Sequence, residues 1–241
     1  MSVYDINGNN LSGTYGQLPN VVFLGDSICT YPNSPAFGGW IFDMNDYISF
    51  ESLKTYGVGD STWKVTANRS SMYAQFLTLK DEVDNGRTPP DVIVINAGIN
   101  DVVYNTPVGT ASEAFNGEDI LSSDPLTLAT LYSSIRYTCE SIIAEYPSAQ
   151  LILVTPYQSG LMARETGVRN VRDAIIESAK RLGLKVINQT DDLPIYNYNE
   201  SISPHYLRAD GTHPSSYGEQ LLTRFFVKEL PPLVLPEISS D

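Results

Sequence analysis

The sequence predicts a three-layer α/β/α fold in which helices cover both faces of a parallel sheet. Strand-like and helical patterns alternate along the 241 residues, which is the order of repeated βα units. Three of the strand-like runs are almost continuously apolar, as expected of strands buried on both faces. Hydrophobic residues make up 42% of the chain, which is enough for a sizeable core, so a single α/β domain accounts for the pattern.

Each expected strand is a short run, and helical patterns fall between and after the strands. The strand-like runs are NVVFLG at 20–25, SLKTYG at 52–57, DVIVINA at 91–97, AQLILVT at 149–155 and LKVIN at 184–188. The helical patterns lie at roughly 38–48, 69–85, 126–146, 167–182 and 215–230. Two long irregular segments remain, 104–125 and 189–210, and loops of this length usually carry function.

The N-terminal segment differs from the rest of the chain. Residues 1–18 are polar and rich in Gly and Asn, so we expect an arm or linker there and the α/β domain over 19–241. An ordinary arm and the last unit of a repetitive spacer both stay open. The segment has no basic start and no apolar run, so we expect no signal peptide in it. Two locations are consistent with this segment. The protein is either cytoplasmic, or it is an excised extracellular or phage-associated domain that forms part of a larger extracellular or virion assembly.

Charge and composition argue against two classes of partner. The formal net charge is −13, whereas nucleic acids and anionic membrane surfaces attract clustered Lys and Arg. No stretch approaches the roughly 18 apolar residues that span a bilayer. The two cysteines, Cys29 and Cys139, are most simply two free thiols, with one bridge as the alternative. The oligomeric state is not indicated.

Chemically active residues follow the strands at the edge where open parallel sheets bind ligands, beyond the carboxyl ends of the strands. Gly25-Asp26-Ser27 follows the first expected strand, Gly57-Val58-Gly59-Asp60 the second, and Gly98-Ile99-Asn100-Asp101 the third. A fourth segment, with Asp210 and His213, precedes the last expected helix. Each segment is a weak signal alone, and together they form a catalytic set.

This set meets the requirements of acyl transfer. The Ser27 hydroxyl needs an imidazole to take its proton, and His213 supplies one. Asp210 supplies the carboxylate that orients the imidazole. The backbone N–H groups of Ser27 and Gly59 and the side-chain amide of Asn100 are the expected donors to the oxyanion.

The four segments, in this order, resemble those of the SGNH (GDSL) hydrolase superfamily from about residue 20 to residue 230. By this resemblance Ser27 corresponds to the nucleophile, His213 to the base and Asp210 to the carboxylate that orients it. Gly59 and Asn100 correspond to the oxyanion donors. The resemblance implies a flavodoxin-like α/β/α fold with five parallel strands and the hydrolysis of esters or thioesters, with no metal and no cofactor.

Rival residues exist for two of these roles. Gly59-Asp60-Ser61 repeats the Gly-Asp-Ser tripeptide, but Ser61 as nucleophile would leave the second group of oxyanion donors empty. His205 is the only other histidine, and it lacks a carboxylate three residues before it, so we expect it on the surface. Taken alone, Ser27 also suits a helix cap. Asp26 is expected to hold the turn.

Aromatic residues point to a carbohydrate ester as substrate. Tyr196, Tyr198 and Tyr206 lie in the second irregular segment, and Trp40 and Trp63 lie near the first two catalytic segments. Rings edged with Asn and Asp suit sugars, although packing explains such rings equally well. We therefore expect a serine esterase that removes acetyl groups from carbohydrate, with the three tyrosines binding the substrate.

Two other functions stay open. A glycan-binding module that kept the fold and lost turnover would explain the rings, but it has no need for a serine, histidine and aspartate set. A lipase or thioesterase-type acylhydrolase would use that set. A lipase would also be expected to carry an exposed apolar lid, and the segment 104–125 is too polar for one.

Overall fold

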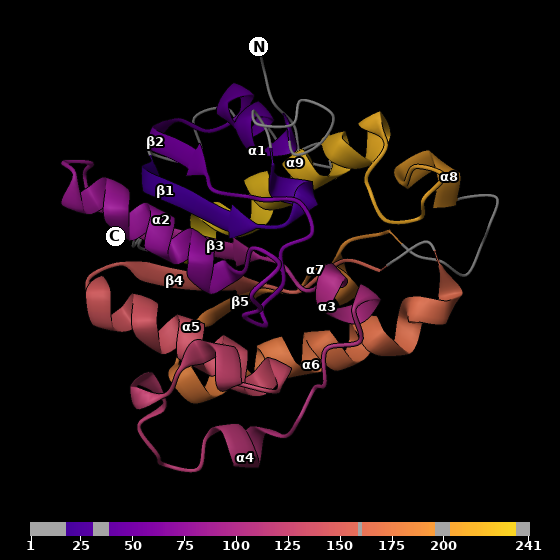
Figure 1. Cartoon of the computed structure of the whole chain (residues 1–241). Helices are drawn as coiled ribbons and strands as arrows, with labels where there is room; N and C mark the ends of the chain where they lie inside the picture. Colours follow the sequence, from indigo (N-terminus) through magenta and orange to yellow (C-terminus); the bar gives the residue numbers. More distant parts are fainter. Residues whose placement is uncertain (1–17, 31–38, 159–160, 196–202, 235–241) are drawn as a thin grey trace, which may run out of the picture.

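The computed structural model describes residues 18–30, 39–158, 161–195 and 203–234 (Figure 1). In this part of the chain, parallel strands form a five-stranded sheet in the order β2-β1-β3-β4-β5. The strands are β1 (Leu18–Gly25), β2 (Phe50–Thr55), β3 (Val92–Asn96), β4 (Gln150–Val154) and β5 (Lys185–Ile187). The predicted α/β/α fold with five parallel strands is confirmed. Of the predicted arm, residues 1–17 lie outside the described residues, and Leu18 begins β1.

Helices cover the two faces of the sheet as two layers (Figure 1). One layer consists of α1 (Gly39–Asp43) and α9 (Ser216–Val234), which pack against each other and against the sheet. The other layer consists of α2 (Met72–Asp84), α5 (Leu131–Glu145) and α6 (Glu165–Leu182). These helices correspond to the five predicted helical patterns.

Strand side chains alternate between two core layers, because successive residues of a strand point to opposite faces. Phe23, Val94 and Ile152 belong to the layer under α1 and α9. Leu24 and Ile95 belong to the layer under α2, α5 and α6. All five side chains are fully buried. Burial on both faces is the reason that these strands read as continuous apolar runs.

Capping residues explain why two helices begin later than predicted. The pattern predicts starts near 69 and 126, whereas α2 begins after Ser71 and α5 after Thr130. The Ser71 hydroxyl accepts a hydrogen bond from the Ala74 N–H at 3.1 Å. Thr130 and Ser133 form a reciprocal capping box at the start of α5. These bonds satisfy N–H groups that have no partner in the first turn of a helix.

Short helices lie between the longer elements, some of them in the two segments that the sequence shows as irregular. They are α3 (Ile99–Val103), α4 (Ala111–Ala114), α7 (Gln189–Asp192) and α8 (Ser203–Tyr206). Short 3-10 helices are η1 (Ser27–Cys29), η2 (Met44–Asp46), η3 (Ile120–Ser122), η4 (Pro125–Thr127) and η5 (Met162–Arg164). Among the described residues, no helix combines the length and the apolar character needed to cross a membrane.

Candidate active site

Ser27 lies directly beyond the carboxyl end of β1, at the start of η1. Asp26 caps this turn, and its carboxylate accepts a hydrogen bond from the Ile28 N–H at 3.0 Å. Gly25 lies so close to Cys29 that a Cβ at this position would come within 2.7 Å of the Cys29 sulfur. The tight turn leaves Ser27 half-buried at the edge of the sheet and buries Cys29 beneath it. Cys29 and Cys139 are both free and buried.

The structure joins the predicted serine, histidine and aspartate in one chain of hydrogen bonds. Nε2 of His213 lies 2.8 Å from Oγ of Ser27, and Nδ1 lies 2.9 Å from Oδ2 of Asp210. An ionised carboxylate can only accept a hydrogen bond, so Nδ1 carries the ring proton and Nε2 is left to accept from the Ser27 hydroxyl. This is the tautomer that a general base for Ser27 requires.

Asp210 is held as an ionised acceptor. Burial by itself would raise the pKa of the Asp210 carboxyl, but hydrogen bonds from the His213 N–H, the His213 ring and the Thr212 N–H lower this pKa below its usual value. The two backbone bonds measure 2.9 Å from His213 and 2.8 Å from Thr212, and both go to Oδ1. The same loop thus fixes the carboxylate and keeps Oδ2 for the imidazole.

Thr212 is anchored from two sides, and neither anchor has a signal in the sequence. The buried Tyr157 donates its phenolic O–H to the Thr212 carbonyl at 2.6 Å. Nη1 of Arg164 donates to the Thr212 hydroxyl, also at 2.6 Å. Because Thr212 precedes His213, these two bonds hold the loop that carries the histidine and the aspartate.

The predicted oxyanion donors come from loops after β2 and β3. Asn100 lies in the first turn of α3 and is 7% exposed. Its side-chain amide donates one hydrogen bond to the Ser61 carbonyl at 3.0 Å, which leaves the second N–H of this amide for a ligand. Gly98, which precedes α3, has a φ of 133°, a value that favours glycine. At Gly59 an added Cβ would meet nothing within 4 Å, so open space lies beside this backbone.

Comparison with known proteins shows the family of the chain. The sequence model of the GDSL-like Lipase/Acylhydrolase family matches residues 23–221. The chain belongs to this family. No curated protein sequence matches the chain.

Solved structures similar to this GDSL-like protein cover most of its length. A lipase/acylhydrolase from Enterococcus faecalis is 21% identical, with a TM-score of 0.58 over 90% of this chain and 98% of that one. A structure described as an acetyl xylan esterase is 19% identical, with a TM-score of 0.57 over 86% and 96%. A protein from Lactobacillus plantarum is 16% identical, with a TM-score of 0.67 over 88% and 96%. At these identities the likeness shows the fold alone.

One buried side chain of the GDSL-like domain, Gln75 of α2, joins two of its candidate catalytic segments. Oε1 of Gln75 accepts from the Gly25 N–H at 2.8 Å, and Nε2 donates to the Gly25 carbonyl at 2.7 Å and to Oγ of Ser61 at 3.0 Å. The Ser61 carbonyl in turn accepts from Asn100. Gln75 therefore links the turn that carries Ser27 to the Asn100 amide, and we call this set of bonds the clamp. Its signal in the sequence is a polar residue on the buried face of an amphipathic helix.

Two buried carboxyl groups lie next to these segments. Asp26 and Asp101 are each 1% exposed. Burial raises the pKa of Asp26 to about 7, in spite of the hydrogen bond from Ile28, and the Asp101 charge adds to this shift. Burial also raises the pKa of Asp101 to about 6, although the Trp63 and Lys64 N–H groups donate to it. Both aspartates hold turns, as expected for Asp26 from the sequence.

The rival residues lie in other environments. Ser61 is fully buried, and its hydroxyl accepts from Gln75. His205 is exposed on α8, as predicted. The suggestion that Trp40 and Trp63 bind sugar is wrong, because both rings are fully buried.

Of the three predicted substrate-binding tyrosines, the structure describes Tyr206. It is half-buried, and its ring centroid lies 5.7 Å from that of the exposed Tyr217 of α9. Tyr196 and Tyr198 lie outside the described residues. In the part of the chain that the structure describes, no group of three or more His, Cys, Asp and Glu residues is placed to hold a metal ion.

Proposed function

We propose that the protein is a serine esterase that hydrolyses short-chain esters through an acyl-enzyme on Ser27, and that its natural substrates are acetyl groups on carbohydrate. The observation that supports this most directly is the continuous hydrogen-bond chain from Ser27 through His213 to Asp210, at 2.8 Å and 2.9 Å. A serine that only capped a turn would need no imidazole. The intact chain also favours turnover over a purely glycan-binding role.

In the acylation step, the oxygen of Ser27 attacks the ester carbonyl while Nε2 of His213 takes the hydroxyl proton. The new bond joins Oγ to the acyl carbon, and the carbonyl electrons move onto oxygen. When this tetrahedral intermediate collapses, the bond to the alcohol oxygen breaks, and the alcohol leaves with the proton from His213. Asp210 stabilises the imidazolium while the histidine holds this proton.

Three donors can stabilise the negative oxygen of the intermediate. They are the backbone N–H groups of Ser27 and Gly59 and the second N–H of the Asn100 amide. Loss of one such donor costs about 3–4 kcal/mol of barrier in comparable sites.

In the deacylation step His213 takes a proton from water, the hydroxide oxygen bonds to the acyl carbon, and the Ser27 oxygen leaves with that proton. The products are the free acid and the regenerated Ser27 hydroxyl.

The acetyl preference rests on the small apolar surface beside the donors. Val58 lies next to Gly59 and is 45% exposed, and Val103 lies on α3 with Asn100 and is 37% exposed. Both are small branched side chains. A site for long acyl chains would gain about 0.8 kcal/mol for each methylene that it buries, and it would need a longer apolar surface. One of the solved structures with this fold is described as an acetyl xylan esterase.

A chromogenic acyl series tests the proposal. We expect 4-nitrophenyl acetate to be hydrolysed fastest, with activity already lower for the octanoyl ester, and we expect acetate release from acetylated oligosaccharides. A preference for octanoyl or longer chains would overturn the acetyl preference and leave the serine chemistry intact. Absence of acetate release from every acetylated glycan tested would overturn the carbohydrate part.

The nucleophile is tested with matched serine variants. Ser27→Ala should abolish hydrolysis and leave the melting temperature nearly unchanged. Ser141→Ala, in which the lost hydroxyl bonds to the Tyr137 carbonyl on α5, should keep full activity. A serine-directed phosphonate should label the peptide that contains residue 27. Labelling of the peptide that contains Ser61 instead would refute the assignment.

A further inference from the structure

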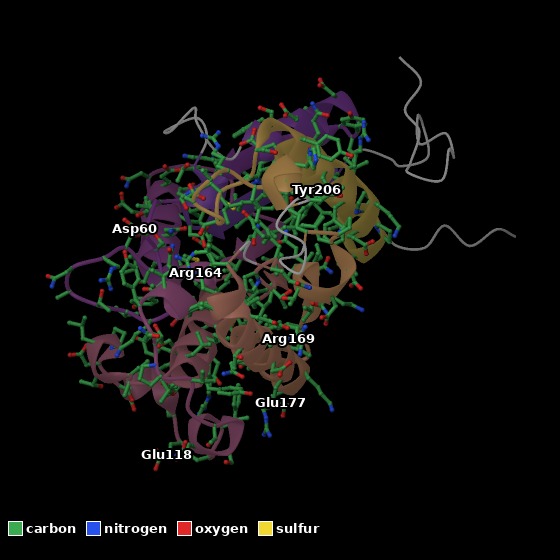
Figure 2. All side chains as sticks on the ribbon, turned by 90° about the vertical axis from the view of Figure 1, so that its right-hand side faces the viewer. Asp60, Glu118, Arg164, Arg169, Glu177 and Tyr206 are labelled. Atoms are coloured by element: carbon green, nitrogen blue, oxygen red, sulfur yellow. The ribbon has the colours of Figure 1, made fainter. Side chains whose placement is uncertain are left out.

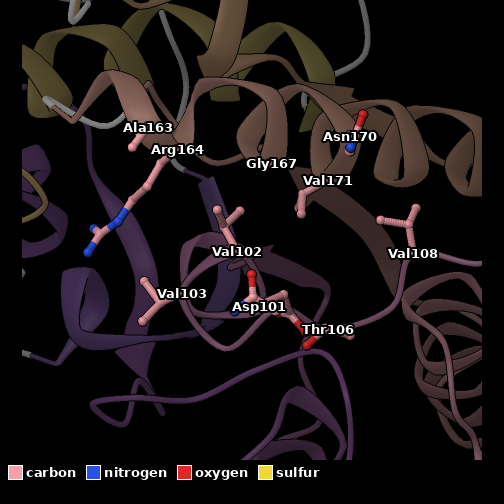
Figure 3. Close-up of a pocket in the computed structure, with 11 residues that line it drawn as sticks. Asp101, Val102, Val103, Thr106, Val108, Ala163, Arg164, Gly167, Asn170 and Val171 are labelled. Carbon is pink, nitrogen blue, oxygen red and sulfur yellow. The ribbon is translucent and has the colours of Figure 1, made fainter.

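A cavity of about 450 Å³ lies between α3 and the start of α6 (Figure 3). Its volume falls within the roughly 300–1,000 Å³ of known small-molecule sites. One wall is the stretch from Asp101 to Val108, and the other is the stretch from Ala163 to Val171. The lining is mixed, with valine side chains beside polar ones such as Asn105, Thr106 and Asn170.

The cavity adjoins the candidate catalytic residues through both of its walls. Asn100 precedes the first residue of one wall, Asp101, in the same helix α3. Arg164 of the other wall donates to the hydroxyl of Thr212, the residue before His213. Figure 2 shows Arg164 on the same face of the molecule as Asp60, which follows Gly59. A group bound in this cavity would therefore lie close to an ester carbonyl on Ser27.

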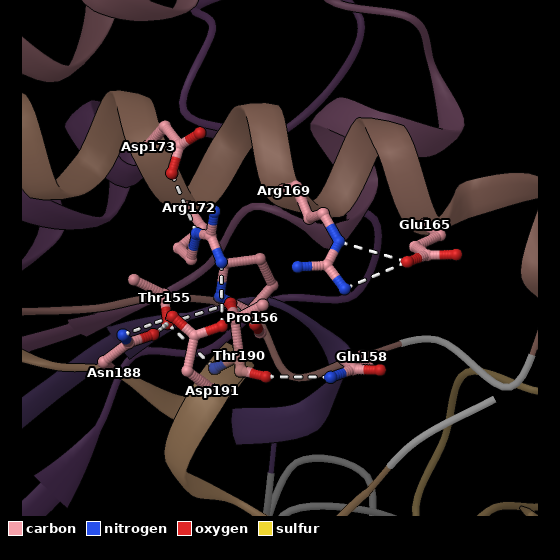
Figure 4. Close-up of polar contacts among 10 residues, drawn as sticks. All are labelled: Thr155, Pro156, Gln158, Glu165, Arg169, Arg172, Asp173, Asn188, Thr190 and Asp191. Atoms are coloured by element: carbon pink, nitrogen blue, oxygen red, sulfur yellow. Dashed lines mark hydrogen bonds and ion pairs between the residues drawn. The ribbon is translucent and has the colours of Figure 1, made fainter. Parts of the chain in front are cut away.

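Arg164 is the basic residue of the cavity lining, and its charge has no acidic partner among the described residues. Its guanidinium extends from the end of η5, directly before α6, toward the side of α3 that carries Val103 (Figure 3), and one nitrogen, Nη1, bonds to Thr212. By contrast, Arg169 and Arg172 of α6, the helix that follows, form ion pairs with carboxylates (Figure 4). The chain has 28 acidic and 15 basic residues, so carboxylate partners are abundant.

The acidic residue of the lining does not neutralise Arg164. Asp101 is buried, and its two oxygens accept hydrogen bonds from the Trp63 and Lys64 N–H groups. A half-buried guanidinium that keeps unused donors at the mouth of a cavity is suited to bind a carboxylate, because its fork of N–H groups matches two carboxylate oxygens.

We propose that this cavity binds the alcohol part of the ester and that Arg164 pairs there with a carboxylate of the substrate, so that the preferred substrates are esters on acidic, uronic-type sugars. This inference rests on the proposed esterase function and adds the chemical class of its substrate. The side chains of Val102, Val108 and Val171 would face the ring carbons, and the polar residues would face the hydroxyl groups.

Two methyl glycosides that carry an acetyl group at the same position test the proposal. The galacturonide carries a carboxylate at C6, and the galactoside carries a hydroxymethyl group there. We expect kcat/KM for acetate release to favour the galacturonide by about 10- to 100-fold, the range of one hydrogen bond to a charged group. Arg164→Gln should bring this ratio close to one, mainly by raising KM for the galacturonide. Loss of the bond to Thr212 would affect both substrates alike, so the ratio isolates recognition of the carboxylate.

Arg224→Gln is the matched control, because it removes the same charge from an exposed position on α9, in the layer opposite α6. It should keep the ratio of the unchanged protein. Equal kcat/KM for the two glycosides in the unchanged protein, or the same ratio in Arg164→Gln, would overturn the proposal.

Binding of the deacetylated methyl glycosides, measured by calorimetry, is independent of turnover. We expect the galacturonide to bind at least about 10-fold more tightly than the galactoside, and Arg164→Gln to lose this difference. Equal binding of both would overturn the carboxylate site even if 4-nitrophenyl acetate is hydrolysed. Selective binding without hydrolysis of any ester would instead overturn the proposed function and leave the carboxylate site standing.

Discussion

Replacing Gln75 with leucine removes the side chain that joins the nucleophile turn to the oxyanion segment, at nearly constant volume. Three hydrogen bonds are lost, two to Gly25 and one to Ser61. The Gly25 carbonyl keeps its bond from the Val58 N–H at 3.2 Å, whereas the buried Gly25 N–H loses its acceptor. An unsatisfied buried donor costs about 1–3 kcal/mol, and each other bond about 1 kcal/mol. The free energy of unfolding should therefore fall by about 3 to 5 kcal/mol.

The same change should affect catalysis, because Gly25 precedes the turn that carries Ser27, and the Ser61 carbonyl accepts from the Asn100 amide. A displacement near 1 Å can lower a rate by about 100-fold. We expect kcat for 4-nitrophenyl acetate to fall between about 10- and 100-fold with little change in KM. Urea unfolding gives the loss of stability, which for a domain of this size corresponds to a melting temperature lower by roughly 10 °C.

Leu79→Ala is the control, because Leu79 is a fully buried residue of the same helix that belongs to the core cluster. It should destabilise the protein by about 2–5 kcal/mol and leave kcat nearly unchanged at temperatures where the protein is folded. If both variants lose stability and the kcat of Gln75→Leu equals that of Leu79→Ala, Gln75 has no role in positioning Ser27 and Asn100, and the reasoning is refuted.

Three further predictions follow from the site. Burial raises the pKa of Asp26 to about 7, so the native state holds a proton that the unfolded chain releases near its usual value of 3.8, and the free energy of unfolding falls as pH rises between these values. At pH 8, Asp26→Asn should therefore be more stable than the unchanged protein by up to about 4 kcal/mol, and at pH 4 it should be no more stable. Urea unfolding at the two pH values measures this difference, and an equal gain in stability at both would contradict the prediction. His213→Ala should lower kcat by several orders of magnitude and Asp210→Asn by distinctly less, and the reverse order would exclude His213 as the base. A chelator should leave esterase activity unchanged, because the chemistry of Ser27 needs no metal; activity restored by added metal would contradict this.

The fold and the candidate residues could be predicted because they depend on local patterns. Strands such as 20–25 and 91–97 are buried on both faces, so their apolar runs are visible without any knowledge of their partners. The residues after parallel strands meet at one edge of the sheet, and this made Ser27, Asn100 and the pair before the last helix recognisable as a set. Helix starts were less predictable, because caps such as Ser71 are side-chain contacts that a hydrophobic period does not report.

Contacts between distant segments were decided only by the tertiary structure. Trp40 and Trp63 read equally well as sugar-binding or as packing residues, and it is their complete burial that makes them core residues. Gln75 lies in ordinary helical sequence and Arg164 lies just before such a sequence. What distinguishes them is their hydrogen bonds to residues 50 and 48 positions away in the chain. By itself the sequence determined the fold class and a set of catalytic candidates. The structure determined which side chains hold that set in place and what lies beside it, because packing partners and cavities depend on how separate elements meet in space.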